Sequence, residues 1–314
     1  MFTINLNEEY KIKIEKGNEF RDSIFNDVYI NATKNVADII LNSTFTSEYD
    51  DFNNIIAFTG ERGKGKSSSM ISFRDALVGN KNEENKHFFA LDNFFDNNLN
   101  KSFELIRNNS FAKIDIVDPS LFRGNESLFE IILAKMFSKF QKEIRDKNSI
   151  ISDDNRRIII KHFQDVFNNL KIIKGDRREL YNQETIDALS NLATSSNLRN
   201  CFKDLIEEYL KKFENKDFLV IAIDDFDLNV SGSFDMLEDI RQFLIQDKII
   251  ILIACKIEQL RESILNNLYK EFEYLLKYNS KELKEIELIN KTEKYLEKLI
   301  PFEKRLELPN LKMF

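Results

Sequence analysis

The chain has 314 residues, 42% of them hydrophobic, and a net charge of −7, which fits one large α/β domain or two small ones. The negative charge argues against a protein that coats nucleic acid by charge alone, although a local basic groove stays open. Two cysteines are too few for a disulfide framework. The longest apolar run, 249–255, is too short to cross a bilayer, and residues 1–7 do not resemble a secretory signal. We therefore expect a cytoplasmic protein without a membrane span.

The first half of the chain alternates short apolar runs with longer amphipathic stretches. The expected elements, in order, are strands at 2–6 and 10–14, a helix over 19–44, a strand at 55–58, a helix over 65–77, a mostly irregular segment over 80–101, a strand at 113–117 and a helix over 128–140. The elements before the strand at 55–58 form an N-terminal extension over residues 1–50.

Residues 145–216 are charged and carry helical signals without strand signals. A crossover between two parallel strands needs only about a dozen residues, and this segment is much longer. We therefore predict a helical insertion over 145–216, which interrupts a core made of residues 51–144 and 217–314.

The last hundred residues return to alternating strands and helices. The expected elements are a strand at 218–223, a helix over 234–245, a strand at 249–254, helices over 257–278 and 288–300, and a short strand at 305–308. The near-continuous apolar run at 218–223 is typical of a central parallel strand. Together the elements predict an α/β fold with a central parallel sheet flanked by helices on both faces.

A phosphate-binding motif follows the strand at 55–58. Residues 60–67 match G-x-x-x-x-G-K-[ST], the P-loop, in which glycines turn backbone N–H groups toward a phosphate and the next helix adds its positive end. Lys66 can reach the β- and γ-phosphates, and Ser67 can ligate Mg²⁺. The residues expected to bind the nucleotide are Gly60, Glu61, Arg62, Gly63, Lys64, Gly65, Lys66, Ser67 and Ser68.

A second motif ends the apolar run at 218–223. Such a run followed by a carboxylate is typical of the Walker B strand, whose terminal Asp holds Mg²⁺ beside the P-loop. Asp224 fits this metal role, and Asp225 can orient and deprotonate the attacking water. Asp227 either caps the next turn or assists the site. The long separation between the two motifs predicts that a further strand lies between their strands in the sheet.

With residues 60–67 and 221–228 as markers, the chain resembles KAP-type P-loop NTPases, including the N-terminal NTPase core of bacterial phage-defence (RADAR-like) ATPases. Stretches 116–122 and 299–309 also resemble this family. The resemblance implies an additional-strand (AAA+/STAND/KAP-like) fold, ATP and Mg²⁺ as cofactors, and a homo-oligomer or a partner effector protein. The chain lacks the membrane-spanning insertions of many such proteins, and Leu228 stands where the family has Arg.

The resemblance also implies roles for residues further along the chain. The strand at 249–254 corresponds to a sensor strand, so Cys255 or Lys256 at its end is expected to contact the γ-phosphate, while a solvated helix start is an equal alternative for Lys256. Arg305 is positioned to act as an arginine finger toward a neighbouring subunit. The alternative for Arg305 is a surface ion pair with Glu303 or Glu307.

The motifs predict an ATPase whose cycle drives a conformational switch or an assembly step, and the resemblance implies a role in bacterial antiviral defence. One rival is an interaction module that binds nucleotide with little hydrolysis. Another is a small-molecule P-loop kinase, which usually needs an Arg-rich lid and a compact acceptor site. The long helical insertion and the double Asp do not suggest such a kinase. No guanine-specificity signature follows Asp225, so ATP is the expected nucleotide.

Overall fold

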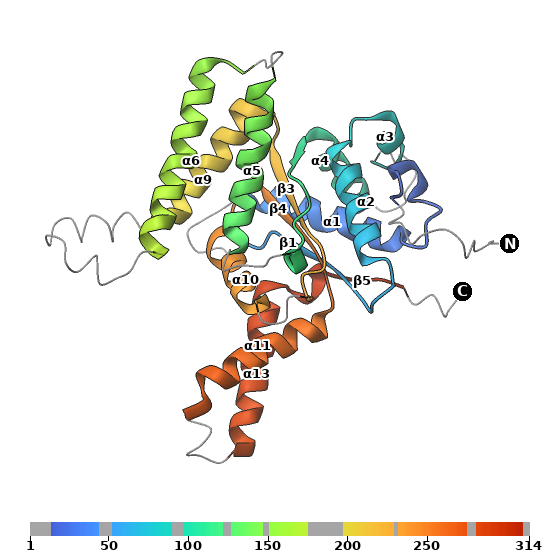
Figure 1. Cartoon of the computed structure of the whole chain (residues 1–314). Helices are drawn as coiled ribbons and strands as arrows, with labels where there is room; N and C mark the ends of the chain where they lie inside the picture. Colours follow the sequence, from blue (N-terminus) through green and yellow to red (C-terminus); the bar gives the residue numbers. More distant parts are fainter. Residues whose placement is uncertain are drawn as a thin grey trace, which may run out of the picture.

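A five-stranded parallel sheet lies at the centre of the molecule (Figure 1). Its strands are β1 (Ile55–Thr59), β2 (Phe111–Lys113), β3 (Phe218–Ile223), β4 (Ile249–Cys255) and β5 (Arg305–Glu307). They lie in the order β2-β3-β4-β1-β5, and each neighbouring pair is parallel. The structure is a computed structural model and describes residues 14–43, 52–89, 97–121, 127–146, 151–174, 197–228, 232–274 and 281–309.

The three central strands, β1, β3 and β4, are buried along their whole length, as expected for apolar runs between two layers of helices. Side chains alternate between the faces of a strand. Ile55 and Ala57 therefore join the hydrophobic cluster on one face of the sheet, and Ile56 and Phe58 join the cluster on the other. The predicted α/β fold with a parallel sheet flanked by helices is confirmed.

One face of the sheet is covered by helices from the first third of the chain. These are α1 (Asn26–Ser43), α2 (Lys66–Val78), α3 (Glu83–Phe89) and α4 (Asn97–Asn108). Aromatic rings fill this layer: Phe20 stacks on Tyr29, and Phe88 meets Phe103 edge to face with ring centroids 5.4 Å apart. Edge-to-face contacts of this kind stabilise a core beyond the area that they bury.

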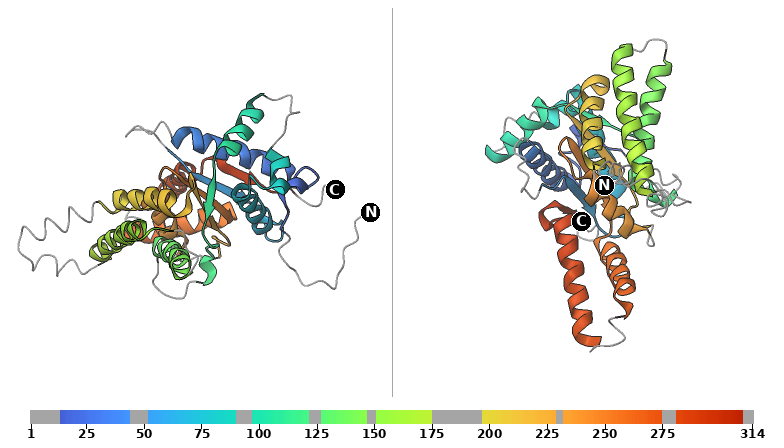
Figure 2. Two further views of the ribbon diagram at one scale, coloured as in Figure 1. Left: turned by 90° about the horizontal axis from the view of Figure 1, so that it is seen from above. Right: turned by 90° about the vertical axis from the view of Figure 1, so that its left-hand side faces the viewer.

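The opposite face is covered by helices from the rest of the chain. These are α5 (Leu128–Arg145), α6 (Asp153–Lys174), α9 (Leu198–Tyr209), α10 (Ser233–Asp239), α11 (Ile257–Glu271) and α13 (Lys281–Leu299). α9 and α10 each continue into a π-helical turn, Leu210–Glu214 and Ile240–Leu244. The views in Figures 1 and 2 show α11 and α13 side by side in a hairpin that projects beyond the sheet. Of the helices in the described ranges, none has both the length and the apolar character that a bilayer crossing requires.

The segment expected to be a helical insertion is helical where the structure describes it, in α6 and α9. Val166 of α6 and Phe202 of α9 belong to the same hydrophobic cluster as Ile221 of β3. These helices therefore extend the core layer on one face of the sheet. The boundaries 145–216 as a separate insertion remain a prediction.

The irregular segment expected over 80–101 is the main error at the level of elements. The structure places α3 in it and starts α4 at Asn97. Phe88 and Phe89 on α3 and Phe103 on α4 are all buried. The Asn- and Asp-rich composition favours turns, but burial of these rings outweighs that local preference.

Several boundaries also differ from expectation. β2 lies at Phe111–Lys113, before the predicted 113–117, because the Ser110 N–H donates to the Asp217 carboxylate at 2.8 Å and aligns β2 with β3. α1 begins at Asn26, after a 3₁₀ turn at Gly17–Glu19, and α13 begins at Lys281, earlier than expected. The strands predicted at 2–6 and 10–14 lie outside the described residues, except for Ile14, which is not in a strand.

Candidate functional site

The segments that carry the predicted site residues meet at one edge of the sheet. In an open parallel sheet, ligands bind where the carboxyl ends of the strands meet. Thr59 at the end of β1 pairs with Cys255 at the end of β4, and Ile223 at the end of β3 lies beside Ile253 of β4. The loop after β1 and the residues after β3 and β4 therefore emerge together. β4 lies between β1 and β3, which confirms the predicted intervening strand.

The loop after β1 owes its shape to three glycines. Gly60, Gly63 and Gly65 have φ angles of 151°, 82° and 88°, which side chains rarely allow. The loop leads directly into α2, whose first helical hydrogen bond runs from the Ser69 N–H to the Gly65 carbonyl at 2.9 Å. The N–H groups that precede Ser69 have no helical acceptor, and the positive end of the helix lies with them. This arrangement suits a bound phosphate.

An aromatic ring covers the last of these glycines. A Cβ atom added to Gly65 would lie 2.8 Å from Cζ of Phe25. The Phe25 ring is itself held edge-on against Tyr29, with centroids 6.3 Å apart. Sequence reasoning missed this contact, because Phe25 lies in the segment before β1 and nothing local connects it to the loop.

Gly65→Ala is expected to lower the free energy of unfolding by about 2–3 kcal/mol, because it combines a strained φ with a clash against Phe25. Gly63→Ala is the matched control: its φ is 82°, but an added Cβ meets no atom within 4 Å. It should cost only the backbone part, about 1–2 kcal/mol. Urea denaturation measures both values, and equal losses would show that the Phe25 ring does not constrain Gly65.

Lys66 lies over the loop that it follows. Its Nζ donates to the carbonyl oxygens of Gly60 at 3.0 Å and Glu61 at 3.3 Å. Its charge also opposes the rise in the pKa values of Asp225 and Asp227. An anionic phosphate is a stronger acceptor than a neutral carbonyl, so Lys66 is placed to exchange these contacts for a ligand.

Ser67 and Asp224, the predicted metal ligands, are in direct contact. The Ser67 hydroxyl donates to Oδ1 of Asp224 at 2.7 Å. The described residues contain no group of three or more His, Cys, Asp or Glu side chains arranged to hold a metal ion. Mg²⁺ is usually bound by one or two protein carboxylates together with water and substrate phosphates. Ser67 and Asp224 therefore fit Mg²⁺ that arrives with a phosphate ligand.

Asp225 has an unusual backbone and a basic carboxylate. Its φ is 46°, in the left-handed region, and its N–H donates to Oδ1 of Asp224 at 3.0 Å. Burial, followed by the negative charges of Asp224 and Asp118, raises the pKa of Asp225, while Lys66 and Arg62 act in the opposite direction. A raised pKa is expected of a carboxylate that accepts a proton near neutral pH.

Asp118 belongs to the same group of carboxylates, although the sequence analysis did not assign it to the site. The Val117 N–H donates to the Ala222 carbonyl at 2.9 Å, and the Asp224 N–H donates to the Val117 carbonyl at 2.8 Å. These bonds extend the sheet and bring Asp118 beside Asp224 and Asp225. No comparable sequence signal marks Asp118, because Lys113 and Asp115 interrupt the apolar residues that precede it.

Asp227 is buried, and burial raises the pKa of its carboxylate while the Lys66 charge opposes the shift. Hydrogen bonds from the backbone of Asp227 and Lys256 oppose the shift as Lys66 does, so a turn cap and assistance to the site both stay predictions for Asp227. At the end of β4, Cys255 is buried, and burial raises the pKa of its thiol. Lys256 instead reaches the loop and forms an ion pair with Glu61 at 2.8 Å. Of the two sensor candidates, Lys256 thus reaches the P-loop.

Arg305 lies on β5 opposite Ala57 of β1, and its Nε donates to the carbonyl oxygen of Ile300 at 2.8 Å. Burial lowers the pKa of Arg305, and the carboxylates that oppose this shift are Glu297 and Glu293 of α13. These residues, rather than the predicted Glu303 or Glu307, are its electrostatic partners. The role of Arg305 as an arginine finger stays a prediction.

Arg305→Ala is expected to lower the free energy of unfolding by about 1–2 kcal/mol, because the Ile300 carbonyl loses a charged donor. Arg145→Ala, at an exposed position near the end of α5, serves as the control and should change the value by less than about 0.5 kcal/mol. Chemical denaturation compares the two variants. Equal stability would show that the bond to Ile300 contributes nothing.

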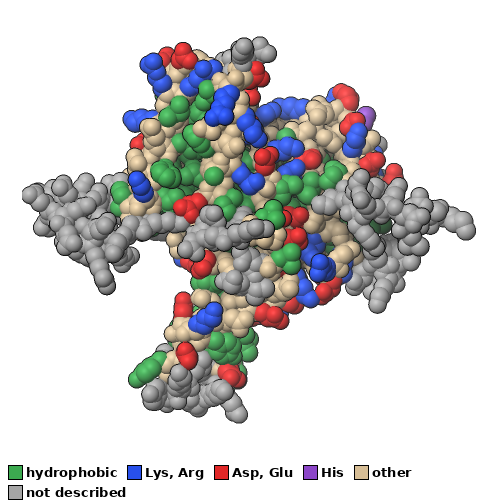
Figure 3. Space-filling model, in the orientation of Figure 1, with side chains coloured by type: hydrophobic (Ala, Val, Ile, Leu, Met, Phe, Trp, Pro, Cys, Tyr) green, Lys and Arg blue, Asp and Glu red, His purple; other side chains and the backbone are tan. Residues whose placement is uncertain are grey.

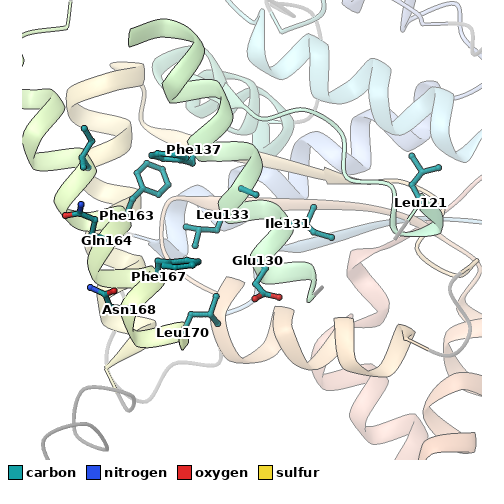
Figure 4. A pocket seen from close by; sticks show the side chains of 12 residues that line it. Leu121, Glu130, Ile131, Leu133, Phe137, Phe163, Gln164, Phe167, Asn168 and Leu170 are labelled. Atoms are coloured by element: carbon teal, nitrogen blue, oxygen red, sulfur yellow. The ribbon is translucent and has the colours of Figure 1, made fainter. Parts of the chain in front are cut away.

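A large hollow lies away from this edge of the sheet. It is an apolar groove of about 960 Å³ between α5 and α6, lined by residues that include Ile131, Phe137, Phe163 and Phe167 (Figure 4). Hydrophobic side chains gather over the same helices on the surface (Figure 3). None of its lining residues belongs to the loop 60–67 or to the aspartates 224–227. The groove is therefore separate from the candidate phosphate site at the sheet edge.

The arrangement joins a phosphate-binding loop, a hydroxyl and carboxylate suited to Mg²⁺, and a basic carboxylate next to them. It can hold a phosphorylated ligand and activate water beside it. Comparison of the sequence with models of known protein families, and with curated proteins, finds no match. The likeness to KAP-type NTPases rests on the motifs alone.

Proposed function

We propose that the protein is a P-loop NTPase that binds and hydrolyses ATP and uses the cycle as a conformational switch or an assembly step. The observation that carries this proposal is the 2.7 Å hydrogen bond between Ser67 and Asp224, which are 157 residues apart in the chain. A glycine-rich turn and a surface aspartate that matched their motifs by chance would have no reason to meet. In a P-loop NTPase the two must share one metal ion.

The strand order supports the finer fold class. β4 separates the strand before the P-loop from the strand before Asp224, as in the additional-strand P-loop NTPases that the motifs resemble. Lys113 at the end of β2 pairs with β3, and Val117 forms a further parallel bridge to Ile223 at the end of β3. β2 and the residues after it thus complete the sheet beside β3. We assign the chain to this class as part of the proposal.

Each residue then has a defined task. The P-loop backbone and Lys66 hold the phosphates, and Ser67 and Asp224 would hold Mg²⁺, which neutralises phosphate charge when bound. Asp225 orients a water molecule and accepts its proton. Its raised pKa makes it a better proton acceptor than an ordinary aspartate.

A single assay separates this proposal from its rivals. Purified protein is incubated with ATP and Mg²⁺, and phosphate release is followed with and without small-molecule acceptors. Steady release without an acceptor supports the proposed ATPase. A phosphorylated acceptor would instead identify a kinase, and binding without turnover would identify an interaction module. GTP in place of ATP tests the base preference.

The oligomer and the arginine finger are tested by mixing variants. Arg305→Ala protein keeps an intact P-loop, and Lys66→Ala protein keeps Arg305. Phosphate release restored in the mixture would support a finger that acts between subunits of a homo-oligomer. A mixture that stays inactive while mixed oligomers form would contradict it. The role in antiviral defence, or with a partner effector, rests on the motif resemblance, and a neighbouring deaminase or nuclease gene would support it.

A further inference from the structure

An ion pair links the P-loop to the end of the central strand β4. Nζ of Lys256 lies 2.8 Å from Oε2 of Glu61. Glu61 is the first residue after Gly60 in the loop, and Lys256 directly follows β4. Because β4 lies between β1 and β3, Lys256 emerges between the phosphate-binding loop and the pair Asp224 and Asp225. An anion bound between these elements would lie within reach of Lys256.

The surroundings of Glu61 are cationic. The hydrogen bond from Lys256, together with the charges of Lys256, Lys64 and Lys66, lowers the pKa of the Glu61 carboxyl. Its carboxylate thus occupies a cluster of cations of the kind that attracts phosphate. The side chains of Lys256 and Glu61 are 29% and 62% exposed. Exposed ion pairs stabilise proteins only weakly and are screened by salt, so this pair can be exchanged.

We propose that Glu61 holds Lys256 when no nucleotide is bound, and that the terminal phosphate of a nucleoside triphosphate takes Glu61's place on Lys256. This inference rests on the proposed function. A diphosphate lacks the group that would reach Lys256 and leaves the ion pair in place. Glu61 thereby acts as an internal competitor for Lys256, and this competition sharpens the distinction between a triphosphate and a diphosphate.

The test compares the affinities of a non-hydrolysable ATP analogue and of ADP, each with Mg²⁺, by calorimetry. Lys256→Gln should weaken binding of the analogue by on the order of tenfold and leave ADP within about twofold, because one charged contact to the terminal phosphate is lost. Glu61→Gln should strengthen binding of the analogue a few-fold, because the competitor is removed. Glu84→Gln, which breaks the exposed pair of Lys16 and Glu84 at 2.7 Å, is the control and should change neither affinity.

Two results would overturn the inference while leaving the proposed function intact. In the first, Lys256→Gln weakens the analogue and ADP equally. In the second, Glu61→Gln weakens the analogue as much as Lys256→Gln does, which would show that the pair only maintains the loop. Melting temperatures confirm that each variant is folded. Wild-type protein that binds neither nucleotide would contradict the proposed function, and this inference with it.

Discussion

Lys66→Ala protein is expected to lose tight ATP binding while it keeps its fold. Lys66 donates to the carbonyls of Gly60 and Glu61 at the rim of the loop, and no other lysine of the loop does so among the described contacts. Its removal takes away a charge-assisted contact to the β- and γ-phosphates. We expect the dissociation constant for ATP to rise by on the order of 10²-fold, as measured by calorimetry.

The matched control for Lys66 is Lys64→Ala, which removes the same charge from the same loop. Lys64 has its backbone in the loop, and its N–H donates to the Glu61 carbonyl at 3.3 Å, a contact that the substitution keeps. Affinity should therefore change by no more than a few-fold. Melting curves check that both variants are folded. Unchanged affinity in Lys66→Ala, or equal losses in both variants, would remove the support for this phosphate site.

Asp225→Asn should keep ATP binding and slow hydrolysis by on the order of 10²-fold or more, because an amide cannot accept the proton of the attacking water. Phosphate release under saturating ATP measures the rate. Asp224→Asn is the contrasting variant. Since Asp224 accepts the Ser67 hydroxyl and is the expected metal carboxylate, its loss should weaken Mg²⁺-dependent binding. Full turnover in Asp225→Asn would point to Asp227 or Asp118 as the proton acceptor.

The raised pKa of Asp225 gives this prediction a pH dependence. The carboxylate acts only when ionised, so hydrolysis should fall as the pH drops through a pKa higher than the ordinary 3.8. The stability of the fold depends on pH in the opposite direction. Because the folded state binds this proton more tightly than the unfolded state, ionisation of Asp225 lowers the stability of the fold as the pH rises.

The same argument separates activity from folding in the Asp225→Asn variant. At neutral pH the substitution removes a carboxylate whose ionised form is disfavoured by burial and by the charges of Asp224 and Asp118. We therefore expect its melting temperature to equal or exceed that of the wild type at neutral pH. If the variant is slow and also has a lower melting temperature, the substitution has damaged the backbone at position 225, where φ is 46°. The slow rate would then not indicate a lost proton acceptor.

Much of the sheet could be predicted from the sequence because the signal is local. The runs that became β1, β3 and β4 are apolar throughout and buried on both faces, so their composition alone identifies them. β2 was misplaced because its position depends on contacts between Ser110 and Asp217, which lie far apart in the chain. The helix α3 was not expected for a similar reason, because its buried Phe88 and Phe89 gain their partners only in the folded layer.

The candidate site divides in the same way. Its motif residues, 60–67 and Asp224 and Asp225, were determined by the sequence itself, because glycines, a lysine and carboxylates at fixed spacing are a chemical requirement of phosphate binding. Only the tertiary structure decided that Phe25 covers Gly65, that Asp118 joins the aspartates, and that Lys256 pairs with Glu61. These relations depend on the order of strands in the sheet and on helices that pack across it. Neither leaves a pattern among neighbouring residues.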